Sequence, residues 1–224
     1  MDNNTENKTI EDFKTTIVRL SDVKEIYGDS FDAFIDTARE KGLYDEVPLF
    51  GGIIRVARKT LDTYSAFSSY RFCKKAYRFM ISTKDVSREY ITNFFEEYSE
   101  RAKENGYELL LSVIDKLDNI NKADIIGNLL KAKIDGFLTI EDYIRLTAAL
   151  QQVPVVDLET LPSYETDREE SKDTYSLLAS GLIYQSVMDG NGHDKFKLNE
   201  NGFLLVKYGL QKDVKFTDSN GVVI

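Results

Sequence analysis

Arg71, Lys74, Lys75 and Arg78 are the residues whose type and spacing most clearly suggest a binding function. Steps of three, four and seven positions from Arg71 place all four side chains on one face of a helix. Cationic groups gathered in this way could bind phosphates of lipids or nucleic acids, or carboxylates of an acidic protein. The same pattern is typical of a helix that packs on a core and leaves its charges in solvent. Both interpretations remain open from the sequence.

A second basic group, Arg55, Arg58 and Lys59, precedes the first. The two groups are offset by 16 positions (71 − 55), which at about 100° per residue places them nearly opposite one another on a straight helix. A break would let both groups face one partner, and the serines of "SAFSSY" at 65–70 could supply it. We therefore predict a basic helical hairpin over about residues 47–82, with all seven cations as candidate anion-binding residues.

The charge of the 224-residue chain is unevenly distributed around a formal net value of −9. Counting Lys and Arg against Asp and Glu gives 6 against 12 in residues 1–54, 8 against 1 in residues 55–84, and 15 against 25 in residues 85–224. The middle block is thus +7 (8 − 1) and the remainder −16 (21 − 37). An acidic protein disfavours non-specific nucleic-acid binding, but a local basic block attracts phosphates over about 8 Å at physiological salt.

The sequence contains no catalytic signature. His193 is the single histidine and lies among turn residues, with no neighbouring pattern that supplies a nucleophile. Cys73 is the single cysteine, which excludes an internal disulfide, and its place on the apolar face of the basic helix predicts a buried structural thiol. Adjacent acids such as Glu96 and Glu97 point in different directions on a helix. We predict no catalytic residue and no cofactor, and a hydrolase built from dispersed carboxylates is the enzymatic alternative.

Two stretches partly match the pattern of a calcium-binding loop, but each has the wrong residue at a required position. In "KAKIDGFLTIED", placing Gly136 at the sixth position of a calcium loop puts Lys131 and Lys133 where acidic ligands are required. In "DGNGHDKFKLNE", Asp194 takes the place of that glycine, and the stretch is better explained as a glycine-rich hairpin turn. We therefore predict no metal site.

Apolar periodicity predicts a mainly helical chain. Helices are expected at about residues 30–41, 88–105, 107–118, 121–135 and 140–153, besides the basic hairpin. Thr139 and Asp142 have the spacing of a capping box at the start of the last of these helices. We divide this part of the chain into a polar segment at 1–28 and a helical domain at 29–153.

The composition changes at Pro154, where prolines and acids mark an acidic connection over residues 154–172. Beyond it, a helix, a strand, the turn "DGNGHD", a second strand and a closing helix follow in the order of a winged helix. The fold class expected is mainly α, a multi-helix bundle followed by a small winged-helix-like α+β module at 173–224. The segment in the place of a reading helix is acidic, so this module is expected to pack or dimerise rather than bind DNA.

Several stretches resemble the Abi-alpha-like group of bacterial and prophage proteins associated with abortive infection. They are "VPLFGGIIRVARKTLD", "LDNINKADIIGNLLKAKIDGFLTIEDYIRLTAAL", "LLASGLIYQ" and "FKLNENGFLLVKYG", which together cover most of residues 47–210. The middle stretch is also similar to TerB-like tellurite-resistance domains, the alternative family. The Abi-alpha resemblance implies a helical protein of a bacterium or its phage with a role in antiviral defence, and it assigns no functional residue.

The leading hypothesis is a non-enzymatic protein whose basic hairpin binds an anionic partner. A membrane surface or an acidic protein is favoured over nucleic acid, because each basic stripe has an apolar back that an interfacial helix needs for insertion. The alternative is a structural or protein-interaction module, homo-oligomeric, with the hairpin packed in the core. The chain has no leader-like start and no apolar run of the roughly 20 residues that span a bilayer, so we expect a cytoplasmic location.

Overall fold

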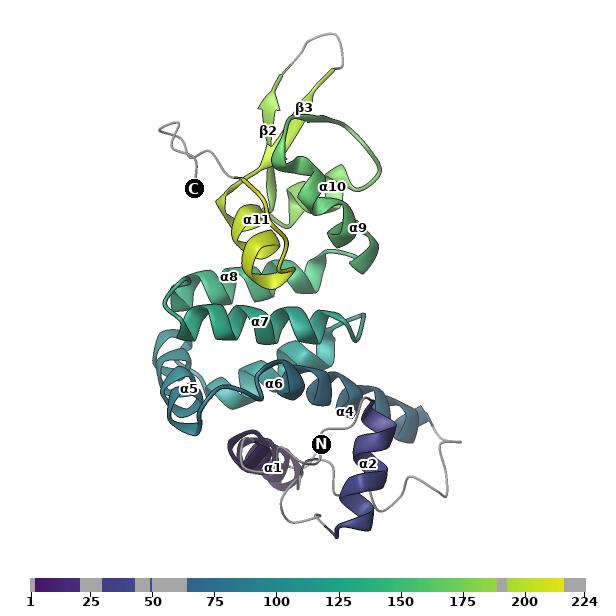
Figure 1. Cartoon of the computed structure of the whole chain (residues 1–224), viewed down its shortest axis with the longest axis vertical. Helices are drawn as coiled ribbons and strands as arrows, with labels where there is room; N and C mark the ends of the chain where they lie inside the picture. Colours follow the sequence, from purple (N-terminus) through teal and green to yellow (C-terminus); the bar gives the residue numbers. More distant parts are fainter. Residues whose placement is uncertain (1–2, 21–29, 43–48, 50–63, 189–192, 216–224) are drawn as a thin grey trace. The chain divides into compact units, whose positions relative to one another are not determined.

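The computed structural model describes residues 3–20, 30–42, 49, 64–188 and 193–215 (Figure 1). These residues form helices and one small antiparallel sheet near the C-terminus. The predicted fold class, mainly α with a small winged-like α+β module, is confirmed. No helix in the described part of the chain is long and apolar enough to cross a membrane.

Contacts within the chain divide it into two compact units, residues 1–127 and 128–224. The division falls inside helix α7, Lys122–Ile134. The domain limits expected at 28/29, 153/154 and 172/173 are based on changes in sequence composition, and they remain predictions.

The first unit consists of helices. They are α1 (Asn3–Leu20), α2 (Phe31–Glu40), α4 (Tyr64–Ser82), α5 (Arg88–Ala102), α6 (Gly106–Lys116) and the first half of α7. Helix α1 lies against α5 and α6, and α4 lies against α2 and α6 (Figure 1). The core of this unit therefore lies where α6 meets the helices on either side of it.

Helix α1 is the main element that the sequence did not predict, because its polar start suggested only a polar segment over residues 1–28. Ile10, Phe13 and Ile17 are nonetheless buried, and their spacing places them on one helical face. The Phe13 ring packs edge-on against Phe95 and Tyr107, with ring centroids 6.5 and 6.4 Å apart. These buried residues hold the helix in place once α5 and α6 supply their partners.

Helix α4 is continuous from Tyr64 to Ser82, so the break predicted at residues 65–70 is wrong. Serine lowers helix propensity only slightly, and residues 64–82 contain neither glycine nor proline to force an end. The first arm of the predicted hairpin, over residues 47–63, lies outside the described residues except for Leu49.

The sequence predicts an apolar face of α4 made of Phe72, Cys73, Ala76, Tyr77 and Met80, and all of these residues are buried except Phe72, which is half-buried. Tyr77 packs against the aromatic rings of α2, with its ring centroid 4.7 Å from that of Phe34. The C-terminal end of α4 lies close to α7 at Gly127, and the contact requires glycine at this position. A Cβ atom placed on Gly127 would lie 1.6 Å from the Ser82 hydroxyl oxygen.

The second unit combines helices with a three-stranded sheet. Its elements are the second half of α7, α8 (Ile140–Gln152), α9 (Val155–Thr160), a 3-10 helix η2 (Leu161–Glu165), β1 (Arg168–Glu169), α10 (Thr174–Ala179), β2 (Ile183–Val187), β3 (Lys195–Leu198), α11 (Glu200–Leu204) and a π-helical turn η3 (Leu205–Gly209). The capping box predicted for α8 is confirmed, since the Thr139 hydroxyl accepts from the Asp142 amide at 3.1 Å and the Asp142 carboxylate accepts from the Thr139 amide at 2.9 Å.

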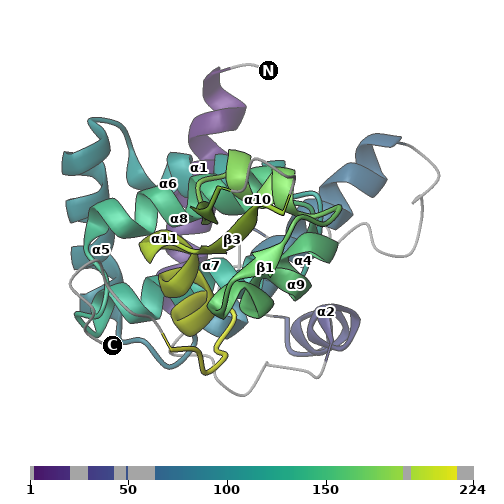
Figure 2. The ribbon, with the colours of Figure 1, turned by 90° about the horizontal axis from the view of Figure 1, so that it is seen from above.

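The sheet has the strand order β1-β3-β2, and both pairings are antiparallel. Figure 2, which looks from above, shows β1 beside β3. Inward-facing Ile183 pairs with Leu198, while outward-facing Tyr184 pairs with Lys197. This arrangement of α10, the β2-β3 hairpin and α11 is the winged-like module that the sequence predicts.

Candidate functional site

Four of the seven predicted anion-binding residues lie in the described part of the chain. They are Arg71, Lys74, Lys75 and Arg78, which we call the α4 cations. The other three, Arg55, Arg58 and Lys59, fall outside the described residues. The function of the α4 cations depends on whether their charged groups are available to a partner or already bound within the chain.

Lys75 is buried, with 6% of its surface exposed. Its ammonium donates to the backbone carbonyl of Asp115 and, at 3.1 Å, to that of Leu117. Both carbonyls lie at the end of α6, where helices leave carbonyls without helical partners and carry a partial negative charge. Burial lowers the pKa of Lys75, and the nearby Asp115 carboxylate partly offsets this effect. Lys75 therefore caps α6.

Arg78 binds a carboxylate of α7. Its Nε donates to the Asp124 oxygens at 2.9 and 3.0 Å, and its Nη2 also contacts Oδ2. This two-point geometry is the arrangement in which a guanidinium binds a carboxylate most strongly. The Arg78 side chain is 46% exposed, so the pair is screened by water and we expect a contribution near the upper end of the roughly 0.2–1 kcal/mol for exposed pairs.

Lys74 and Arg71 are bound more loosely. The Lys74 ammonium lies 3.7 Å from the Asp32 carboxylate of α2 and 4.7 Å from the centre of the Tyr70 ring. A hydrogen bond with Tyr70 raises the pKa of Lys74. Arg71 is exposed and donates at 3.3 Å to the Asp118 carbonyl, which also lies beyond the end of α6.

The structure thus brings the α4 cations together with acidic groups that sequence reasoning missed. Asp32 and Asp124 bind Lys74 and Arg78, and the charge of the Asp118 carboxylate acts on Lys75; all three acids are far from α4 in sequence. A further cation, Lys122, is fully buried and pairs with the Asp118 carboxylate at 2.6 Å. The acidic excess of the flanking segments was the only sequence signal for such pairing, and it does not identify partners.

Cys73 is buried, as the sequence predicts. Burial raises the pKa of its thiol to about 12, so almost no thiolate exists at neutral pH. Because the thiolate is the reactive form, the cationic neighbours of Cys73 in the sequence do not make it a nucleophile.

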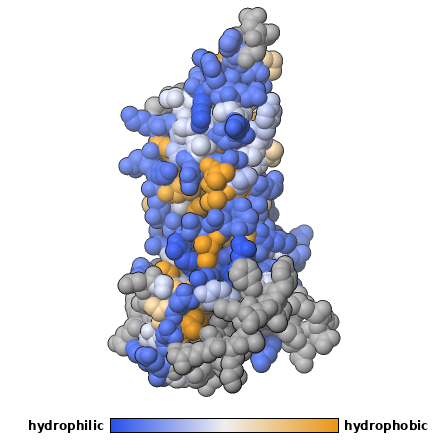
Figure 3. All heavy atoms as spheres, turned by 90° about the vertical axis from the view of Figure 1, so that its right-hand side faces the viewer, coloured by the Kyte–Doolittle hydropathy of each residue, from blue (hydrophilic) through white to orange (hydrophobic). Residues whose placement is uncertain are grey.

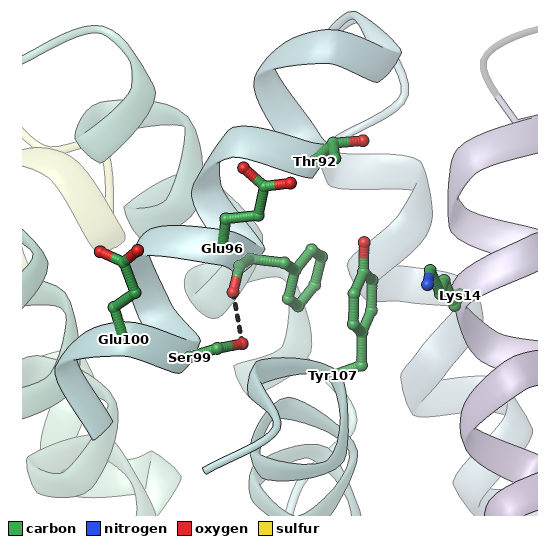
Figure 4. Close-up of a pocket in the computed structure, with 7 residues that line it drawn as sticks. Lys14, Thr92, Glu96, Ser99, Glu100 and Tyr107 are labelled. Atoms are coloured by element: carbon green, nitrogen blue, oxygen red, sulfur yellow. Dashed lines mark hydrogen bonds between the residues drawn. The ribbon is translucent and has the colours of Figure 1, made fainter. Parts of the chain in front are cut away.

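A hollow of about 340 Å³ lies between α1, α5 and the start of α6 (Figure 4). It is lined by Lys14, Thr92, Phe95, Glu96, Ser99, Glu100 and Tyr107. The Tyr107 ring stacks on Phe95 with centroids 3.8 Å apart, and the Ser99 hydroxyl donates to the Phe95 carbonyl and accepts from the Gly106 amide. These contacts join α5 to α6.

The chemistry available in this hollow is limited. Burial, followed by the charges of Glu96 and Glu11, raises the pKa of Tyr107, so its hydroxyl stays protonated at neutral pH and cannot act as a base. The lining contains neither histidine nor cysteine. Across the described residues, no group of three or more His, Cys, Asp or Glu side chains could hold a metal ion.

A polar network in the second unit holds the segment that leads into α10. Buried Asp173 accepts hydrogen bonds from the hydroxyls of Ser171 and Thr160, and Arg168 lies 3.7 Å from its carboxylate. Burial raises the pKa of Asp173, but these hydrogen bonds and the Arg168 charge outweigh burial and lower the pKa overall. The network satisfies the buried Asp173 carboxylate and thereby stabilises the segment that leads into α10.

Comparisons with protein-family models, with curated proteins and with solved structures find no match for this chain. The resemblance to the Abi-alpha-like group, and the alternative resemblance to TerB-like domains, therefore remain predictions from sequence.

Proposed function

We propose that this chain is a non-enzymatic protein-interaction module in which the α4 cations stabilise its first unit instead of forming a binding surface. The single observation that carries the proposal is the binding of every α4 cation to a group of the chain itself. Lys75 and Arg71 bind backbone carbonyls beyond α6, and Lys74 and Arg78 bind carboxylates of α2 and α7. This supports the alternative in which the basic helix belongs to the packed interior.

Recruiting Lys75 to an external phosphate would be unfavourable. Its two carbonyl acceptors would lose a charged donor, and each hydrogen bond to a charged group contributes about 1.5–3 kcal/mol. A phosphate at a membrane surface, bound in competition with salt and water, contributes about 1 kcal/mol for each basic residue. The anionic-partner hypothesis thus loses its most central residue and depends on Arg71, Lys74 and Arg78, together with Arg55, Arg58 and Lys59.

Several features of the proposal rest on sequence alone. The setting in bacterial or prophage antiviral defence comes from the resemblance to the Abi-alpha-like group. A cytoplasmic location and a homo-oligomeric state are likewise predictions from the sequence. The proposal of a non-enzymatic role is supported by the unreactive Cys73 and the protonated Tyr107, which are the most evident candidates for chemistry in the first unit.

Flotation with lipid vesicles tests the proposal. The purified chain would be mixed with anionic and with neutral vesicles over a salt series, and with labelled single-stranded and duplex nucleic acid in parallel. We expect no flotation and no nucleic-acid binding at physiological salt. Flotation with anionic vesicles alone that weakens as salt rises, and that is abolished in an Arg71→Gln/Lys74→Gln variant, would contradict the proposal and return the α4 cations to the role of a binding surface.

A further inference from the structure

We propose that two copies of this chain associate through the outer edge of β2, which joins their two three-stranded sheets into one continuous antiparallel sheet. This inference rests on the proposed interaction function and names the partner as a second copy. The two-fold axis of the dimer passes beside Tyr184, so that this residue faces its own counterpart.

The strand β2 lies at the edge of the sheet. The strand order β1-β3-β2 gives it β3 as a neighbour on one side, and no described residue pairs with its backbone on the other side (Figure 1). An edge strand presents a row of backbone donors and acceptors that can pair with another strand. The outer edge of β2 can therefore take a further strand.

Hydrogen bonding within the sheet shows which backbone groups of β2 point outward. The Asn199 amide donates to the Leu182 carbonyl at 3.2 Å, so this carbonyl faces β3. The direction alternates along an antiparallel strand, so the backbone groups of Tyr184 also face β3. The amides and carbonyls of Ile183 and Gln185 therefore point away from the sheet.

A β-bulge limits the outer edge to a short window and thereby fixes the register of the dimer. The pairing with β3 shifts between Gln185 and Val187, so the regular alternation holds only over residues 183–185. Two such windows pair when Ile183 of each copy lies opposite Gln185 of the other, and each of these pairs exchanges both of its backbone hydrogen bonds. This register places the two Tyr184 residues directly opposite one another.

Tyr184 adds a side-chain contact to this pairing. Its ring lies on the outward face of the sheet, 44% exposed, and aromatic residues directly opposite one another stabilise neighbouring strands. The residue that pairs with Tyr184 on β3 is Lys197. In the dimer the two Lys197 residues are three strand spacings apart, about 14 Å, which exceeds the Debye length of about 8 Å at physiological salt, so their repulsion is screened.

The absence of charge on β2 favours a second copy as the occupant. Residues 179–188, "ASGLIYQSVM", contain no Asp, Glu, Lys, Arg or Pro, although 30% of the whole chain is charged. Charged residues and proline are the usual protection of an edge strand against pairing. Like charges directly opposite one another are destabilising, so an uncharged strand is suited to pair with itself, and it offers no charge that would select a different partner.

This association does not require a large apolar surface. On the face drawn in Figure 3, hydrophobic surface occurs as separate patches among hydrophilic residues. A contact made mainly by backbone hydrogen bonds of one strand is small, and interfaces below about 1,200 Å² are typical of weak, reversible complexes. We therefore expect a dissociation constant of about 10 μM to 1 mM.

Sedimentation equilibrium of the full chain tests the proposal, over a concentration series that reaches about 1 mM. We expect the wild type to form dimers reversibly. Tyr184→Lys and Tyr184→Glu each place like charges opposite one another, so each should weaken dimerisation about fivefold or more. An equimolar mixture of the two variants should associate about fivefold or more tightly than either alone, because Lys then faces Glu.

Two further variants separate the strand edge from general surface effects. Tyr90 of α5 is 57% exposed, and Tyr90→Lys should leave dimerisation unchanged. Gln185→Pro removes an outward amide without removing a hydrogen bond of the sheet, so it should weaken dimerisation while circular dichroism stays as in the wild type. A wild type that is monomeric at about 1 mM, equal effects of Tyr90→Lys and Tyr184→Lys, or a mixture that associates no more tightly than its components would overturn the proposal.

Hydrogen exchange of the backbone amides locates the contact. The amides of Ile183 and Gln185 should exchange rapidly in the dilute monomer and slowly at concentrations where the dimer forms. Slow exchange of both amides in the monomer would show that the outer edge of β2 is already covered within one chain, and it would overturn the proposal.

The outcomes are distinct from those that test the proposed function. Flotation of the wild type that the Arg71→Gln/Lys74→Gln variant abolishes would refute the role given to the α4 cations and leave the dimer intact. A chain that neither floats nor dimerises would overturn the dimer and leave the role of the α4 cations intact.

Discussion

Lys75→Met is the substitution with the largest predicted effect on the stability of the first unit. Methionine is an unbranched side chain of similar length, so the main loss is that of the ammonium. The carbonyls of Asp115 and Leu117 would then lack their donor at the end of α6. Two hydrogen bonds to a charged group, at about 1.5–3 kcal/mol each, give a gross loss of about 3–6 kcal/mol.

Part of this loss is recovered, because methionine does not carry the desolvation cost that lowers the pKa of Lys75. We therefore expect the free energy of unfolding to fall by about 2–4 kcal/mol. Urea unfolding of the full chain, followed by far-ultraviolet circular dichroism at neutral pH, measures the change. The chain contains no tryptophan, so the helical signal is the better probe.

Lys74→Met is the matched control, on the same helix and one position away. The Lys74 ammonium is 3.7 Å from Asp32, and both side chains are partly exposed. Pairs of this kind contribute about 0–1 kcal/mol, so the control should change stability little. If Lys75→Met cost no more than Lys74→Met, or raised stability, the capping role of Lys75 would be refuted.

Three other residues give predictions of different kinds. Gly127→Ala should destabilise the chain by about 1–3 kcal/mol in urea unfolding, because its Cβ would overlap Ser82, and adding Ser82→Gly should restore part of the loss. Cys73 should resist a thiol-specific disulfide reagent at pH 8 in the folded chain, because the pKa of its thiol is about 12, and it should react once the chain is unfolded. Rapid reaction in native buffer would contradict its burial. Burial raises the pKa of Tyr98 from 10.0 to about 12. The unfolded chain therefore releases this proton at a lower pH than the folded chain, so the contribution of Tyr98 to the free energy of unfolding is present below pH 10 and is lost as pH rises from 10 to 12. Tyr98→Phe should thus lose less stability over that interval than the wild type, and identical pH dependence of the two would show that Tyr98 is not the titrating group.

The fold was largely predictable where local sequence determines it. The capping box of Thr139 and Asp142 acts within one turn of helix, and the order of α10, β2, β3 and α11 follows from short-range patterns of turn and apolar residues. Helix α1 was not predictable in this way. Its three buried apolar residues are separated by polar ones, and they are buried only because α5 and α6 pack against them.

The roles of the α4 cations could not be read from sequence for a different reason. Spacing shows which face carries the charge, but it does not show what lies opposite. The acceptors of Lys75 are 40 and 42 positions away, and the carboxylate bound by Arg78 is 46 positions away. Only tertiary packing brings α4 beside the end of α6 and the start of α7, and that packing supplies the internal partners on which the proposed supporting role rests.

The most direct test replaces all four α4 cations by glutamine in one variant and measures its free energy of unfolding in urea. The control variant carries four exposed substitutions elsewhere in the first unit, at Lys84, Arg88, Lys103 and Lys116. We predict a loss of about 3–5 kcal/mol in the α4 variant and less than about 1 kcal/mol in the control. Wild-type stability in the α4 variant would contradict the structural role of the α4 cations.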